Sequence, residues 1–275
     1  MVGPHGADPR GISMGGAKLA RRLREHDWVA AAIEFVIVVL GILLALQVSN
    51  WNQDRVDRER GARLETRLRE ELISDREAMN EALAFWRKVS EFGVAAMDYS
   101  EHASLLEGDA WKTVLAYYQA SQLYPFELED TTFLEMRDTG SLALIADESL
   151  RKRIADYYRM GGAGLRANIL YHRPEYREEI RGFTPWKIQE YIWSNCFRQG
   201  KGASQDLIDC PSPMSDVDAR QLLESYRLSG SLLEHLREWM STMKISAIVV
   251  DGMQNDASAL IDTLEVVQSA KRSGP

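Results

Sequence analysis

The chain has 275 residues, of which 45% are hydrophobic and 27% are charged, and its formal net charge at pH 7 is −8. This composition is typical of a globular protein with one membrane segment, and it excludes a disordered chain and a multi-span membrane protein. Residues 52–275 hold 28 of the 33 basic and 37 of the 41 acidic residues. An acidic domain binds a phosphate backbone poorly, so we expect no nucleic acid among its partners.

An apolar run of 24 residues extends from Trp28 to Trp51, with a tryptophan at each end. As a helix it reaches roughly 35 Å, enough to cross a hydrocarbon core of about 30 Å with some tilt. Tryptophan favours the membrane–water interface, so Trp28 and Trp51 are predicted interface anchors. A cleaved signal peptide has a shorter apolar core followed by a small-residue cleavage site. The run therefore favours a retained transmembrane helix over residues 28–51, in contact with the lipid bilayer.

The flanks of this run bear on its orientation. Residues 1–16 are rich in glycine and proline and are expected to be disordered. Residues 17–27 form a basic juxtamembrane segment that we expect to join the span as one helix, and basic residues before a first span tend to stay cytoplasmic. Arginines also follow the span, so the basic residues alone do not decide orientation. A long following domain translocates largely regardless of charge, which favours a cytoplasmic N-terminus and an exported domain over residues 52–275.

Three residues within the span suggest contact with another helix. Gly41 and Ala45 form a small-xxx-small pair, which lets a second helix approach closely. Glu34 is an ionisable group at membrane depth, where such residues are functional candidates. A structural role at the interface is the alternative for Glu34, and it is favoured over proton chemistry. The predicted partner is another membrane protein or a second copy of this chain, bound through the face that carries Glu34, Gly41 and Ala45.

The helical period continues beyond the span, because no proline interrupts Gln53–His102 and apolar residues recur every three to four positions. A long stalk helix is therefore expected. Further helices are predicted over 111–122, 131–138, from 148, from 185, and from 216 to about 270, with an interruption near Ser229 and Gly230. Expected N-terminal caps are Asp109, Asp130, Asp147 and Thr184. Gly140 is expected to end the helix that begins after Asp130.

Residues 196–215 are the longest stretch of loop composition after the span, and the two cysteines, Cys196 and Cys210, bracket most of it. A disulfide closing a loop of about 15 residues stabilises a protein by roughly 3 kcal/mol and indicates an exported compartment. Two free thiols in a cytosolic domain are the alternative. We predict the disulfide.

No segment alternates convincingly as a strand, and the β-branched cluster Ile245–Val250 lies inside a helical run. The predicted fold class is all-α. It consists of a single N-terminal transmembrane helix that continues into a long stalk helix, followed by an extramembrane helical bundle. The last helix is long enough to lie antiparallel to the stalk.

Several stretches of the sequence carry a resemblance to a known family. They are Glu25–Trp28, Ile33–Phe35, Gln47–Asn52, Thr131–Leu142, Leu144–Ile145 and Tyr157–Tyr158. Together they resemble a bacterial family of single-pass inner-membrane proteins known only as a domain of unknown function. The resemblance implies an inner-membrane location with the domain in the periplasm. It implies no activity and no catalytic residues, and the segment between the cysteines has no counterpart in it.

Motifs for catalysis, cofactors and metals give no site. Ser149–Lys152 spells S-x-x-K without its companion signatures, and Gly162–Ala167 spells G-x-G-x-x-A inside a helical stripe rather than after a strand. The five histidines are scattered, and none stands three residues after a glutamate. We therefore predict no catalytic, cofactor-binding or metal-binding residues.

Two functions remain from different classes. The first is a non-catalytic, membrane-anchored periplasmic module that binds a partner protein or serves as an accessory or sensory subunit of a membrane complex. The second is an unrecognised enzyme that uses polar and aromatic residues of the central bundle, with Glu135, Arg137 and Asp138 as its candidates. The absence of a converging acid, base and nucleophile favours the first. Tyrosine and tryptophan concentrate in the middle third, where core packing explains most of them and a binding surface is the alternative.

Overall fold

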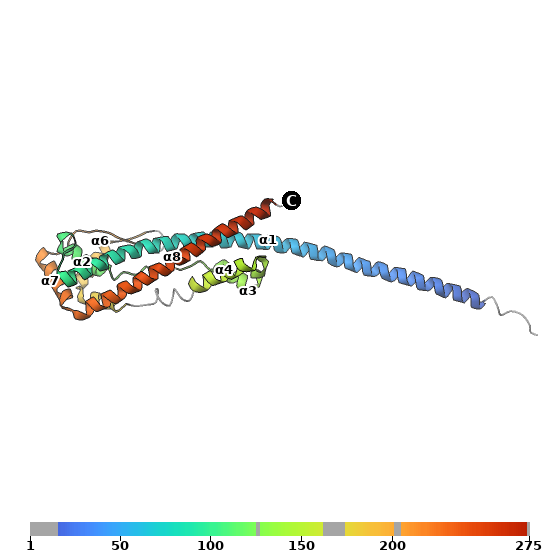
Figure 1. The fold of residues 1–275 in the computed structure, drawn as a ribbon, viewed down its shortest axis with the longest axis horizontal. Coiled ribbons are helices and arrows are strands. Elements are labelled where there is room, and N and C mark those ends of the chain that lie inside the picture. Colours follow the sequence, from blue (N-terminus) through green and yellow to red (C-terminus); the bar gives the residue numbers. More distant parts are fainter. Residues whose placement is uncertain (1–15, 125–126, 162–173, 201–204, 274–275) are drawn as a thin grey trace, which may run out of the picture. The chain divides into compact units, whose positions relative to one another are not determined.

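The computed structural model describes residues 16–124, 127–161, 174–200 and 205–273. In chain order the elements are α1 (Gly16–His102), η1 (Leu106–Gly108), α2 (Ala110–Gln119), α3 (Thr131–Asp138), η2 (Ser141–Leu144), α4 (Glu148–Arg159), α5 (Glu175–Phe183), α6 (Trp186–Asn195), β1 (Phe197–Gln199), β2 (Gln205–Leu207), α7 (Asp216–Leu228) and α8 (Gly230–Ser273). The described part of the chain is almost wholly helical, which confirms the all-α prediction (Figure 1). The predicted disorder of residues 1–16 falls, except for Gly16, outside the described residues, as does the pattern at 162–167.

The chain divides after Glu59 into two compact units. The first contains the one segment of the described chain, beginning at Trp28, that is long and apolar enough to cross a membrane by length and composition. Its side chains are exposed throughout residues 28–51, including Trp28 at 74% and Trp51 at 66%. Exposed apolar surface of this extent marks a protein or membrane contact, and the segment is consistent with association with a bilayer.

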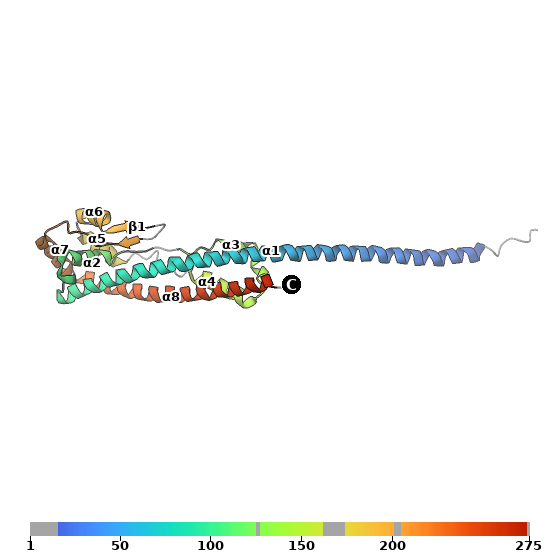
Figure 2. The ribbon, with the colours of Figure 1, turned by 90° about the horizontal axis from the view of Figure 1, so that it is seen from above.

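The second unit is built on the antiparallel pairing of α1 with α8, which run side by side in both views (Figures 1 and 2). Buried residues recur along α1 at helical spacing, and α8 presents a matching stripe. The α1 set is Leu64, Leu68, Leu72, Met79, Trp86 and Val89; the α8 set is Leu232, Leu236, Trp239, Met243, Val250, Leu260 and Leu264. Polar pairs follow the same register, since Glu65 meets Lys271 and Glu101 meets Arg237. The predicted bundle with its last helix antiparallel to the stalk is therefore present.

A cluster of shorter helices covers one end of this pair. Helix α2 packs against α5 and α7, and α5 packs against α8. The buried tyrosine and tryptophan side chains here have partners for their polar atoms: the Tyr176 hydroxyl donates to the Tyr117 carbonyl over 2.7 Å, and Trp239 Nε1 donates to the Ala120 carbonyl over 2.9 Å. Most of the aromatic side chains of the middle third are thus core residues.

The predicted helix ends hold at most positions. Asp109 and Asp147 accept hydrogen bonds from the first turns of α2 and α4, and Gly140 has the left-handed φ of 69° expected after α3. Ser229 separates α7 from α8. Asp130 precedes α3 as predicted, but its side chain makes no capping hydrogen bond. Thr184 is not the cap of α6.

Thr184 ends α5, and Pro185 takes the position before α6. The Thr184 hydroxyl donates to the Ile180 carbonyl over 2.7 Å and lies 2.8 Å from the Tyr226 hydroxyl, so it is not free to cap the next helix. The loop after Cys196 also differs from prediction, because β1 and β2 pair antiparallel with Phe197 opposite Leu207. Strands of three residues are too short to show an alternating pattern in the sequence.

Candidate functional site

The predicted association residues lie on the exposed surface of α1. Glu34, Gly41 and Ala45 are all exposed, and a Cβ atom added at Gly41 would meet no other atom within 4 Å. At 100° per residue the three positions fall within roughly 40° of one another on the helix. The structure thus leaves this face open, and its use as a contact surface stays a prediction.

The three residues suggested for an enzyme do not converge. Glu135 accepts a hydrogen bond from Arg67 of α1 over 2.7 Å, while Arg137 pairs with the adjacent Asp138 over 2.8 Å on the surface. Exposed ion pairs of this kind contribute little energy and hold no reactive group beside another. The structure does not assemble a catalytic arrangement from Glu135, Arg137 and Asp138.

Two carboxylates of α1, Asp75 and Glu71, bind the start of α3 and the residues just before it. Neither was predicted from the sequence. Asp75 is 1% exposed; its Oδ1 accepts from the Glu129 backbone N–H over 2.7 Å, and its Oδ2 accepts from the Tyr157 hydroxyl over 2.9 Å. One turn earlier, Glu71 accepts from the Thr132 backbone N–H over 2.9 Å and from its hydroxyl over 2.6 Å. Glu71 therefore supplies the cap that Asp130 does not.

Burial dominates the electrostatics of this pair. It raises the pKa of Asp75 to about 7, outweighing the lowering effect of the two hydrogen bonds, and the nearby Glu129 and Glu71 raise it further. Burial also raises the pKa of Glu71. Beside them, Tyr158 stacks on Phe133 with ring centroids 4.6 Å apart, and its buried hydroxyl has no hydrogen-bond partner. These groups tie α1, α3 and α4 together.

The sequence held a signal for this pair. Asp75 lies in the apolar stripe of α1, three residues after Leu72 and four before Met79, so a carboxylate stands at a core position. Such a position requires a partner inside the protein. That partner, Tyr157, is 82 positions away and has no local signature.

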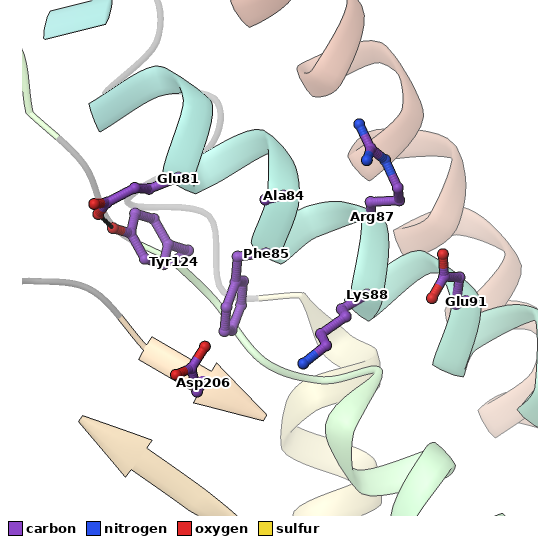
Figure 3. Close-up of a pocket in the computed structure, with 8 residues that line it drawn as sticks. All are labelled: Glu81, Ala84, Phe85, Arg87, Lys88, Glu91, Tyr124 and Asp206. Atoms are coloured by element: carbon purple, nitrogen blue, oxygen red, sulfur yellow. Dashed lines mark hydrogen bonds between the residues drawn. The ribbon is translucent and has the colours of Figure 1, made fainter. Parts of the chain in front are cut away.

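An open cleft of about 380 Å³ lies between α1, the segment after α2, and β2 (Figure 3). Its lining consists of Glu81, Ala84, Phe85, Arg87, Lys88, Glu91, Tyr124 and Asp206. The Tyr124 hydroxyl donates to Glu81 over 3.0 Å, and the rings of Phe85 and Tyr124 lie 5.2 Å apart. Lys88 extends toward β2, where it donates to the Leu207 carbonyl over 2.9 Å.

The cleft is lined by three carboxylates, two basic groups and two aromatic rings. Its tyrosine and lysine are hydrogen-bonded to Glu81 and to the Leu207 carbonyl.

Cys196 and Cys210 lie at disulfide distance, with 1.91 Å between the sulfur atoms and 5.1 Å between the Cα atoms. Both ends of the loop are attached to α2. Trp111 Nε1 donates to the Cys210 carbonyl over 3.1 Å, and Gln119 Nε2 donates to the Cys196 carbonyl over 3.2 Å. The pair is placed for the predicted bond, and the oxidation state in the native protein stays a prediction.

Within the described ranges, no group of three or more His, Cys, Asp or Glu side chains could hold a metal ion. No family model, no curated protein and no solved structure matches the chain. Membership of the inner-membrane family that the sequence resembles therefore stays a prediction.

Proposed function

We propose that this protein is a non-catalytic, membrane-anchored helical module that binds a partner protein and serves as an accessory or sensory subunit of a membrane complex. The observation that carries the proposal is the uncovered apolar surface of residues 28–51. A segment of this length and composition suits a bilayer. Within it, Glu34 and the small residues Gly41 and Ala45 remain available for contact with a second helix.

The absence of catalysis is supported by what the polar side chains of the helical domain do. Asp75, Glu71 and Tyr157 hold α3 and α4 on α1, and Glu135 pairs with Arg67 on the surface. Among the described residues these groups act as structural partners of one another. The enzyme alternative has no comparable observation in its favour.

The proposed location is the bacterial inner membrane, with the N-terminus in the cytoplasm and the domain over residues 52–275 in the periplasm. The basic segment before the span and the pair formed by Cys196 and Cys210 support this orientation. The resemblance to the single-pass family supports the same topology.

The test is co-purification from a mild detergent after a single change in the span. Gly41→Ile adds a branched side chain at the proposed contact face, so we expect loss of the membrane partner or of self-association while the domain stays folded. Ala32→Ile is the matched control, because Ala32 lies on the opposite face of the same helix.

Crosslinking followed by mass spectrometry identifies the partner, and circular dichroism reports on folding. Partner capture that survives Gly41→Ile, or that is lost equally in Ala32→Ile, contradicts association through this face. A protein that runs as a lone monomer in several mild detergents removes the basis for the binding proposal.

A further inference from the structure

Helix α5 carries one acidic pair and one basic pair on different faces, with the exposed Glu178 between them. Residues four apart on a helix share a face. In α5 this places Glu175 and Glu179 on one face, Tyr176 and Ile180 on a second, and Arg177 and Arg181 on a third. Tyr176 and Ile180 are buried in the core. The acidic pair and the basic pair lie on different sides of this buried face and meet different neighbours.

The acidic face of α5 already has hydrogen-bond partners on α8 and just before it. Glu175 contacts His235 Nε2 over 2.8 Å, and Glu179 contacts His235 Nδ1 over 2.7 Å. Glu179 also accepts from the hydroxyls of Ser229 and Ser231. These carboxylates are therefore occupied on the α8 side and do not serve the arginines.

Among the described residues, the basic face meets only neutral groups. Arg177 donates to the Ser121 carbonyl, and Arg181 Nη2 donates to the Gln122 side-chain carbonyl over 3.3 Å. The Arg181 guanidinium lies 5.4 Å from the ring centroids of both Tyr118 and Trp193. No described carboxylate forms an ion pair with Arg177 or Arg181.

A chain of hydrogen bonds orients the side chain of Gln122, the described acceptor of the Arg181 guanidinium. Gln119 Nε2 donates to the Cys196 carbonyl, and Gln122 Nε2 donates to Gln119 Oε1 over 3.2 Å. Gln122 must then turn its own oxygen toward Arg181. A neutral amide thus stands where a carboxylate would form the usual pair with a half-buried arginine.

Two adjacent, partly buried cations without a counter-ion are costly. Burial lowers the pKa of Arg177 to about 10, and the charge of Arg181 lowers it further. Burial lowers the pKa of Arg181 as well, and its buried Nε has no hydrogen-bond partner. The internal stretches 125–126, 162–173 and 201–204 contain no aspartate or glutamate that could supply the missing charge.

We propose that Arg177 and Arg181 form a binding site for a small oxyanion that carries a carboxylate or phosphate group, flanked by the rings of Tyr118 and Trp193. Guanidinium groups match both oxyanions with paired N–H donors, and the ring contacts hold the Arg181 fork in place. The site lies wholly within the helical domain, so binding does not depend on association of the membrane span.

The test is calorimetry and thermal unfolding of the full chain in detergent, with inorganic phosphate and with succinate as separate probes. Sodium chloride at matched ionic strength removes general salt effects. We expect at least one probe to bind with measurable heat and to raise the melting temperature above the chloride control. The probe that binds more tightly distinguishes a phosphate ligand from a carboxylate ligand.

Arg181→Gln is expected to weaken binding by at least about tenfold, because it removes one charged fork. Arg137→Gln is the matched control, since Arg137 is exposed and pairs with Asp138, and its variant should bind like the wild type. Where Arg181→Gln does not fold, Arg181→Lys keeps the charge but not the fork and should weaken binding several-fold. Absence of binding by both probes, or unchanged affinity in the Arg181 variants, overturns the proposal and leaves the membrane role untouched.

Discussion

A carboxylic acid stands inside the apolar stripe of α1 at Asp75, and its protonation is linked to folding. Its pKa is raised to about 7 in the folded protein, mainly by burial, from 3.8 in an exposed chain. Between these values the folded state holds a proton that the unfolded state has lost. The contribution of Asp75 to stability is therefore complete at acidic pH and declines as the pH rises toward 7.

Asp75→Asn is predicted to flatten this pH dependence. In the wild type each pH unit of the window costs up to about 1.4 kcal/mol of unfolding free energy, whereas asparagine does not titrate. Glu71 contributes in the same direction, so part of the slope will remain. Denaturant unfolding of the full chain in detergent from pH 4 to pH 8 measures how the unfolding free energy depends on pH. Asp138→Asn, on the exposed surface of α3, should keep the wild-type slope; an equal slope in the Asp75 variant contradicts the assignment.

Single residues differ in how far their roles could be predicted. Asp109 and Asp147 cap their own helices, so the information is local and the prediction holds. Arg177 and Arg181 donate to Ser121 and Gln122, which follow α2 and lie more than 50 positions away, and their lack of described acidic partners follows from packing. Because these partners are remote in the sequence, no local pattern predicts a role for either arginine.

At the scale of elements, Gly93 of α1 lies against the Met240 side chain of α8. A Cβ atom at this position would overlap the side chain of Met240 on α8, chiefly at its sulfur. The helical period predicted both helices, because the pattern is continuous along each. The stretch that pairs as β1 and β2 was predicted as a loop, since three-residue strands leave no period to read.

Gly93→Ala is predicted to destabilise the domain despite the better helix propensity of alanine. The gain of about 1 kcal/mol from propensity is outweighed by an overpacking cost of about 1 to 3 kcal/mol. The double variant Gly93→Ala with Met240→Ala should recover stability relative to the sum of the single changes, because the overlapping side chain is gone. Thermal unfolding of the four proteins gives the coupling; additive effects would contradict direct contact.

At the scale of the whole molecule, the orientation in the membrane decides whether residues 52–275 lie in the cytoplasm or outside it. A reporter that is active only after export, fused after Pro275, should be active, and one that is active only in the cytoplasm should be silent. This expectation rests on the tendency of basic segments before a first span to stay cytoplasmic and of long following domains to be translocated. The opposite pattern of reporter activities would contradict the proposed orientation.

The proposed orientation would place Cys196 and Cys210 in an oxidising compartment. Native protein should show no thiol that reacts with an alkylating reagent, and two should appear after reduction under denaturing conditions, as counted by mass spectrometry. Cys196→Ser with Cys210→Ser should lower the unfolding free energy by roughly 3 kcal/mol. Alkylation of both residues before reduction is the result that excludes the bond.

The antiparallel register of α1 and α8 also sets the order in which the protein can mature. The pair Glu65–Lys271 joins residues 206 positions apart, so the bundle cannot close while α8 is still being synthesised. Contacts of such long range form late and slowly. In the meantime the stripe that begins at Leu64 leaves the ribosome next to an apolar segment bound for the membrane. The stripe that begins at Leu64 therefore stays uncovered by α8 until the last part of the chain has been made.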